Sequence, residues 1–139
     1  TDAGLAHLKG LKNLRTLDLT GTALTGKGLV HFKDMPTLTR LTLRGTKLGD
    51  AAMEALAGVP QVQFVLLDDT QVTDAGLVHL AKLPNLTYLW LSNTKVTDAG
   101  LAHLQKAKKL RRVYASGTKI TDEGIANFRK AMPNCHVSK

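Results

Sequence analysis

The chain has 139 residues, a hydrophobic fraction of 43% and a formal net charge of +8. This length and apolar content fit one domain with a buried core, and the positive charge favours acidic partners without specifying one. The single cysteine, Cys135, excludes an intramolecular disulfide. No apolar run reaches the roughly 18 residues that predict a membrane-spanning helix.

The sequence repeats itself every 24 residues without a gap. The units in register are residues 1–24, 25–48, 49–72, 73–96 and 97–120, and residues 121–139 begin a sixth copy that degrades. A fixed period of this length is typical of a solenoid. We therefore expect one solenoid domain over residues 1–139, with 121–139 as a degenerate C-terminal cap.

Each unit is predicted to form a short helix and then a short strand. In unit 73–96, Leu77, Leu80 and Leu83 are spaced by three, which fits one face of a helix. Leu89 and Leu91 are two apart, which fits the inward face of a strand. Stacking of like elements would place a parallel sheet on one side and helices on the other.

The polar and small residues of each unit fit this organisation. Thr and Asp begin most helix segments, where they can cap free N–H groups, and proline follows the helix segments. Glycine at the fourth position of a unit predicts a close approach of helix to sheet, with Ala52 the one substitute. A threonine recurs just after each strand, where its hydroxyl is expected to bond the turn backbone: Thr22, Thr46, Thr70, Thr94 and Thr118.

In chain order, three segments differ from a regular interior repeat. The first strand, around residues 14–19, presents an open edge that could pair with a second copy. Unit three departs at 49–53, and residues 129–139 lose the strand pattern, as a closing cap should. Because the chain also begins without Met inside a repeat unit, we expect it to be part of a longer protein, with further repeats upstream.

The motif LxxLxLxxTx(L/V/I)TDxGLxxL resembles the leucine-rich repeat family over nearly the whole chain. It is closest to bacterial arrays that carry Thr where many relatives have Asn or Cys. Its helix half, TDAGLxHL, is similar to the ribonuclease-inhibitor-like class. The resemblance implies an α/β right-handed solenoid with short parallel strands on the concave face and helices on the convex face. It also implies protein binding on the concave face, no enzymatic activity and no cofactor.

Residues that vary among the units and face solvent are the candidates for function. Four of the six aromatic residues occupy outward strand positions in units three to five, and arginines flank them. Trp, Tyr and Arg are enriched in interface hot spots. The predicted binding site for a protein or peptide comprises Arg40, Phe64, Leu66, Tyr88, Trp90, Arg112 and Tyr114.

Other interpretations of these residues stay open. The aromatic side chains could stabilise the sheet by cross-strand pairing, leaving a purely scaffolding segment. The basic residues of units two and five, with the exposed rings, could instead bind nucleic acid or another polyanion. Asp68 and Arg44 lie on neighbouring strands and predict a surface ion pair.

Metal and catalytic chemistry are not expected. Histidine recurs at the seventh position of four units, but Ala55 interrupts the series and no second ligand lies at metal spacing. Cys135 aligns with the apolar Leu86, which predicts a buried structural thiol. No glycine-rich phosphate loop or Ser/His/Asp grouping is evident.

Overall fold

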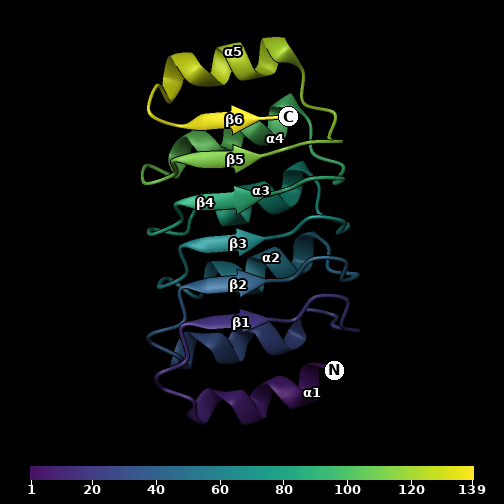
Figure 1. Cartoon of the computed structure of the whole chain (residues 1–139), viewed down its shortest axis with the longest axis vertical. Helices are drawn as coiled ribbons and strands as arrows, with labels where there is room; N and C mark the ends of the chain where they lie inside the picture. The colour runs from purple at the N-terminus through teal and green to yellow at the C-terminus, as the bar shows by residue number, and fades with distance from the viewer.

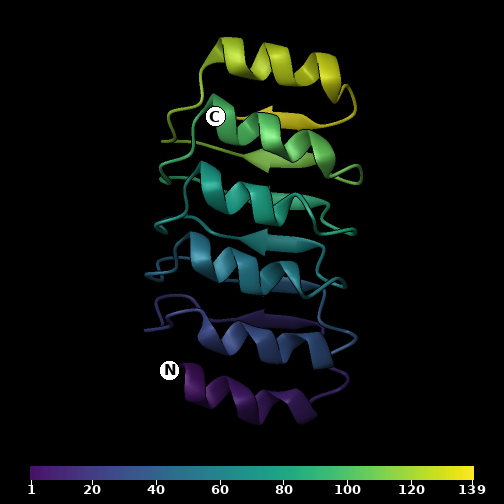
Figure 2. The ribbon, with the colours of Figure 1, turned by 180° about the vertical axis from the view of Figure 1, so that it is seen from behind.

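The computed structural model describes all residues, 1–139. The chain winds as a right-handed coil in which each turn contributes one helix and one strand (Figure 1). The strands form one side of the molecule, here called the strand face, and the helices form the other (Figure 2). The predicted α/β solenoid is confirmed. No helix is both long and apolar enough to cross a membrane.

Six short parallel strands make a single sheet in sequence order. They are β1 (Thr16–Asp18), β2 (Arg40–Thr42), β3 (Phe64–Leu66), β4 (Tyr88–Trp90), β5 (Arg112–Tyr114) and β6 (His136–Ser138). Equal repeat positions lie side by side, as in the pairs Thr16–Arg40 and Phe64–Tyr88. The 24-residue period therefore sets the register of the whole sheet.

The helices differ between the first two repeats and the later ones. The helical elements are α1 (Asp2–Leu5), the 3₁₀ helices η1 (Ala6–Gly10) and η2 (Lys27–Asp34), α2 (Asp50–Ala57), α3 (Asp74–Leu80), α4 (Asp98–His103), the 3₁₀ helix η3 (Leu104–Lys106), and α5 (Asp122–Ala131). The second repeat thus uses a 3₁₀ helix where the third and fourth use α-helices. As predicted, all four prolines come after these segments.

The last residues do form a strand, so the prediction that 129–139 lacks one is wrong. The N–H of Ala115 donates to Ser138 O at 2.8 Å, and the N–H of His136 donates to Arg111 O at 2.8 Å. Cys135 and Val137 are buried with exposed fractions of 3% each. Their alternation supplies an inward face, and strand β6 extends the strand face by one more row.

The core is one cluster of 36 buried residues between the sheet and the helices. The central residue of each of the strands β2 to β5 is fully buried: Leu41, Val65, Leu89 and Val113. The two aromatic residues that do not lie on the strands, Phe32 and Phe128, have exposed fractions of 0% and 2%. The outward-facing side chains of the strand face are therefore not needed to fill the core.

The threonines after the strands have the structural role predicted for them. Each hydroxyl donates to the carbonyl three residues earlier, at 2.6–2.7 Å in all five copies. These bonds satisfy backbone acceptors in the turn that leads from the strand to the next helix.

The aspartates at the helix starts accept hydrogen bonds from the start of the next repeat. Asp50 accepts hydrogen bonds from the N–H of Thr73 at 2.8 Å, the Thr73 hydroxyl at 2.7 Å and the N–H of Gly76 at 2.9 Å. We call this arrangement, an aspartate bonded to the threonine that begins the following repeat, the Asp–Thr clasp. It recurs at Asp2, Asp74 and Asp98.

The clasp also explains the glycine at the fourth position, whose sequence pattern predicts close approach of helix to sheet. A Cβ added at Gly76 would lie 2.5 Å from Asp50 Oδ1, and one at Gly100 would overlap Asp74 Oδ1. By contrast, a Cβ added at Gly4, in the first repeat, would meet nothing within 4 Å. Glycine is thus required because the aspartate of the preceding repeat occupies the space of a side chain.

Candidate functional site

The candidate site is a row of stacked aromatic rings on strands β3, β4 and β5. The Phe64 and Tyr88 rings lie 5.0 Å apart at 6°, and those of Trp90 and Tyr114 lie 4.8 Å apart at 13°. Tyr88 and Trp90, on the same strand, join the two pairs at 6.1 Å and 26°. We call these four rings the aromatic ladder.

An arginine side chain lies against each end of the ladder. The guanidinium carbon of Arg40 is 4.9 Å from the centre of the Phe64 ring. That of Arg112 is 5.8 Å from the centre of the Tyr114 ring, and Arg112 Nη1 also donates to the Tyr114 hydroxyl at 3.4 Å. This hydrogen bond raises the pKa of Arg112. Both contacts have the geometry of cation–π pairs.

The register of the sheet brings the ladder together from residues far apart in sequence. Phe64 pairs with Tyr88, and Trp90 pairs with Tyr114, because each pair occupies one repeat position on adjacent parallel strands. Such neighbours are about 4.8 Å apart, which is also a favourable ring-stacking distance. The 24-residue period therefore places these aromatic side chains beside one another.

Six of the seven predicted site residues offer accessible surface. Arg40 and Arg112 are exposed, and the four rings are half-buried. Leu66 is the exception, because its exposed fraction is only 8%. It lies outside the main core cluster but is covered from the strand face, where Thr42 and Trp90 are its register neighbours. Leu66 therefore adds little accessible surface to the predicted site, although it continues the row of Trp90 and Tyr114 in register.

The nearby carboxylates are already engaged. Asp68 forms the predicted ion pair with Arg44, Oδ2 to Nε at 2.6 Å, and its other oxygen accepts from the N–H of Ser92 at 2.9 Å. Asp18 accepts from the N–H and hydroxyl of Thr20, and these bonds lower the pKa of its carboxyl. The two ion pairs of the structure are Arg44–Asp68 and Lys139–Asp122, so Arg40 and Arg112 have no carboxylate partner.

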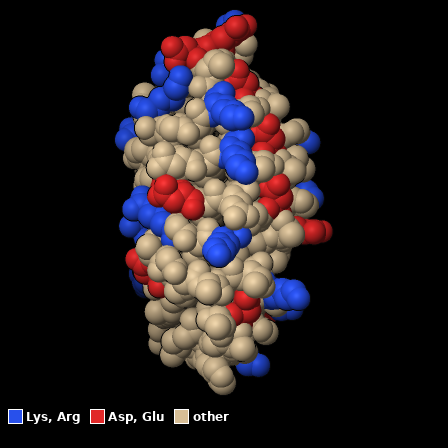
Figure 3. Space-filling model, turned by 90° about the vertical axis from the view of Figure 1, so that its right-hand side faces the viewer, with Lys and Arg blue, Asp and Glu red and all other residues tan.

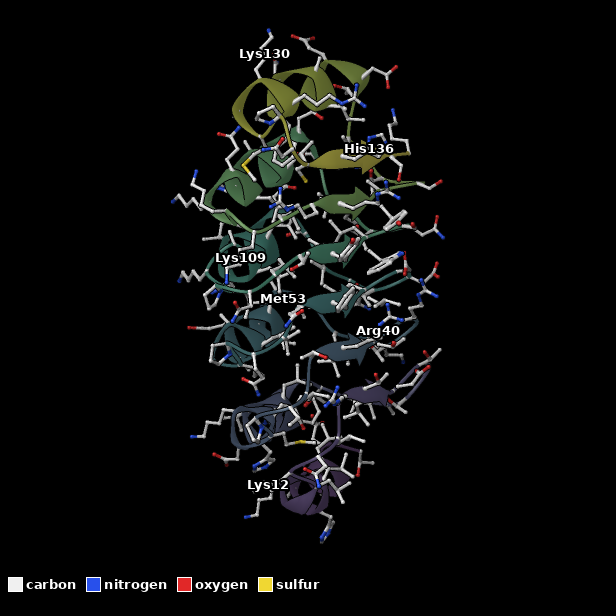
Figure 4. All side chains as sticks on the ribbon, turned by 60° about the vertical axis from the view of Figure 1, so that its left-hand side comes forward. Lys12, Arg40, Met53, Lys109, Lys130 and His136 are labelled. Carbon is white, nitrogen blue, oxygen red and sulfur yellow. The ribbon has the colours of Figure 1, made fainter.

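The structure adds two residues that sequence reasoning missed. His136 and Ser138 of β6 continue the two outward rows beside Arg112 and Tyr114. Figure 4 shows Arg40 and His136 over the strands, whereas Lys109 and Lys130 extend from the opposite side. The apolar alternation of Cys135 and Val137 was the signal that could have revealed this strand.

Most basic residues lie away from the ladder. Lys108 and Lys109, in the turn before β5, bond Gln105 O and Asn85 Oδ1. Just after the strands, one repeat position holds lysine in three units, at Lys47, Lys95 and Lys119. Figure 3 shows the side of the molecule on which the strands end. There Asp and Glu side chains lie beside the Lys and Arg side chains. The basic residues therefore do not form a continuous stripe along this side.

The other chemical candidates are structural. Burial raises the pKa of the Cys135 thiol to about 11, with Arg111 opposing the shift, so the thiol stays protonated at neutral pH. The hollows of the surface also lie elsewhere, for example one of about 340 Å³ between α4 and α5. None of them is lined by a ladder residue. The site is an open surface, which suits a macromolecular partner better than a small molecule.

Comparisons with known proteins agree with this architecture. A family profile described as leucine-rich repeat matches residues 10–32, 34–57 and 82–104, together half of the chain. The chain belongs to the leucine-rich repeat family. Members of this family are generally non-catalytic protein-interaction modules.

Among solved structures, the chain is similar to a leucine-rich repeat protein of Leptospira interrogans, with a TM-score of 0.70 and 20% identity. The match covers 96% of this chain and 33% of that one, so the chain spans about a third of the length of its structural relative. At this identity the likeness supports the fold alone. No curated protein matches the chain.

Proposed function

We propose that the strand face binds a protein or peptide through the aromatic ladder, with Arg40 and Arg112 at its ends. The observation that carries the proposal is the ladder itself, four half-buried rings on an open face with no other part of the chain covering them. Two unpaired arginines beside half-exposed Trp and Tyr match the composition of interface hot spots. The family's general role in protein interaction supports the same assignment.

The competing explanation is that the ladder only stabilises the sheet. Cross-strand aromatic pairs contribute roughly 0.2–1 kcal/mol each, so such a role would be measurable. The central strand residues are already fully buried without help from the ladder, which favours a binding role. A Tyr88→Ala/Trp90→Ala variant separates the two explanations.

The test selects random 12-residue peptides, displayed on phage, for binding to the protein, and compares the double variant with the wild type. We expect enriched peptides that lose binding in the variant at a temperature where circular dichroism shows it to be folded. Val30→Ala/Val78→Ala, two exposed apolar positions away from the strand face, is the matched control and should keep binding. A variant that melts at lower temperature yet binds every peptide unchanged would contradict the proposal.

Nucleic-acid or other polyanion binding by units two and five is the alternative function. It would use ring faces to stack bases, and the ladder rings already stack on one another. A labelled oligonucleotide tests it directly, because such binding weakens steeply as salt rises. No change in anisotropy at low salt would remove this alternative.

A further inference from the structure

The ladder presents ring edges to solvent because its ring faces are occupied. Phe64 has Arg40 against one side and Tyr88 stacked on the other. Trp90 stacks on Tyr114 and has Leu66 as its register neighbour on the other strand. The edge of an aromatic ring carries the positive part of its quadrupole, whereas the face carries the negative part. The exposed part of the ladder therefore favours acceptor groups and negative charge.

Hydrogen-bond donors on the ladder are also free. The Trp90 indole N–H and the Tyr88 hydroxyl make no hydrogen bond within the chain. The Tyr114 hydroxyl differs, because it accepts a hydrogen bond from Arg112. Neither group is buried, since no buried side-chain nitrogen or oxygen lacks a partner. Together with the unpaired Arg40 and Arg112, these donors make a surface that can bind carboxylates and that no carboxylate of the chain neutralises.

The spacing of the two arginines limits the shape of the partner. Arg40 lies on β2 and Arg112 on β5, three strand intervals apart. At about 4.8 Å per interval they are separated by about 14 Å along the sheet. An extended peptide rises about 3.3 Å per residue, so residues four apart span about 13 Å. Residues i, i+2 and i+4 of such a peptide face the same way.

We infer that the ligand of this surface is an extended acidic peptide with two carboxylates four residues apart and an apolar residue midway between them. The carboxylates would pair with Arg40 and Arg112, and the apolar side chain would lie between them on the edges of Phe64 and Tyr88, which occupy the same register row. This inference rests on the proposed function and narrows it to one class of partner. Nucleic acid fits less well, since its bases need free ring faces for stacking.

The test uses the peptides selected above and a synthetic probe, a labelled nonapeptide with glutamate at its third and seventh residues, leucine at its fifth and serine elsewhere. We expect ladder-dependent peptides to be enriched in acidic residues four apart. The probe should bind about tenfold more weakly when both glutamates become glutamine, because its charge pairs with the arginines are lost.

Matched variants of the protein complete the test. Arg40→Gln and Arg112→Gln should each weaken the probe severalfold, and more at low than at high salt. Lys95→Gln and Lys119→Gln each remove one positive charge from the side of the molecule on which the strands end, and they should have little effect on probe binding. Ladder-dependent peptides without acidic residues, or probe binding unchanged in both arginine variants, would overturn the inference and leave the proposed function in place. Absence of any ladder-dependent peptide would remove both.

Discussion

The interface between the second and third repeats, here called the earlier joint, is built differently from the interface between the third and fourth, here called the later joint. At the later joint Asp50 forms the Asp–Thr clasp with Thr73, and Gly76 leaves room for it. At the earlier joint Gly26 stands where the aspartate would be, and Ala52 stands where the glycine would be. Aspartate and glycine are thus replaced together, which indicates that they work as a coupled pair.

Other contacts hold the joint that lacks a clasp. The Arg44–Asp68 ion pair links the ends of β2 and β3, and Arg40 contacts the Phe64 ring. Gln61 Nε2 also donates to Phe32 O at 2.7 Å and Met35 O at 2.9 Å. The same repeat boundary can therefore be stabilised on the helix side or near the strand face. In a solenoid, stability depends on each such nearest-neighbour interface, so the difference can be measured locally.

The largest expected effect comes from replacing Gly76 by alanine, the residue that the third repeat carries at the same position, as Ala52. In Gly76→Ala the new Cβ would lie 2.5 Å from Asp50 Oδ1 and 3.1 Å from Met53 Cγ. Such overpacking should lower the free energy of unfolding by about 1–3 kcal/mol, measured by urea denaturation. Gly4→Ala, at the same repeat position with open space around it, is the control and should gain up to about 1 kcal/mol. Equal stability of the two variants would show that Asp50 does not restrict position 76.

A smaller effect is expected from converting the earlier joint to the later type. Gly26→Asp alone should lose about 1–2 kcal/mol, because Gly26 has a φ of 96° and its new Cβ would overlap that of Ala52. Adding Ala52→Gly and Gly49→Thr supplies both the space and the partner of the clasp. The triple variant should then melt at a higher temperature than the single one, as followed by circular dichroism. If the two extra changes lower the melting temperature further, the coupled-pair explanation fails.

The smallest effect is the response to acid. Burial raises the pKa of Asp2, but hydrogen bonds from the N–H of Gly28, from Thr25 and from the N–H of Gly26 outweigh it and lower the pKa to about 2. Bonds from the Thr121 hydroxyl and N–H likewise lower the pKa of Asp98. Since these values lie below those of the unfolded chain, the stabilisation is complete above about pH 4 and is lost as pH falls towards 2.

Hydrogen exchange at pH 4 and pH 2.5 can locate this loss. Protection should decrease around Thr25 and Thr121, whose N–H groups bond Asp2 and Asp98, more than at the N–H of Ala52, where no clasp exists. Asp98→Asn should remove the pH dependence at Thr121 only. A uniform decrease over all repeats would instead indicate a general effect of charge.

The sequence by itself determined the repeat, the sheet register and the residues of the core. The 24-residue period places equal positions on adjacent strands, so the stacking partners of Phe64 and Trp90 could be predicted before any coordinates. The roles of the threonines and prolines also followed, because each depends on its own turn or helix end. These are local or strictly periodic properties, which a sequence displays directly.

The tertiary structure decided what depends on contacts between repeats that differ. It showed that Leu66 is covered, that the clasp aspartates bond the next repeat, and that the position-four glycines make room for them. It also added β6, since a strand of three residues forms only when a neighbouring strand offers hydrogen bonds. Burial and hydrogen-bond partners are set by the side chains that lie alongside, and these come from residues about 24 positions away.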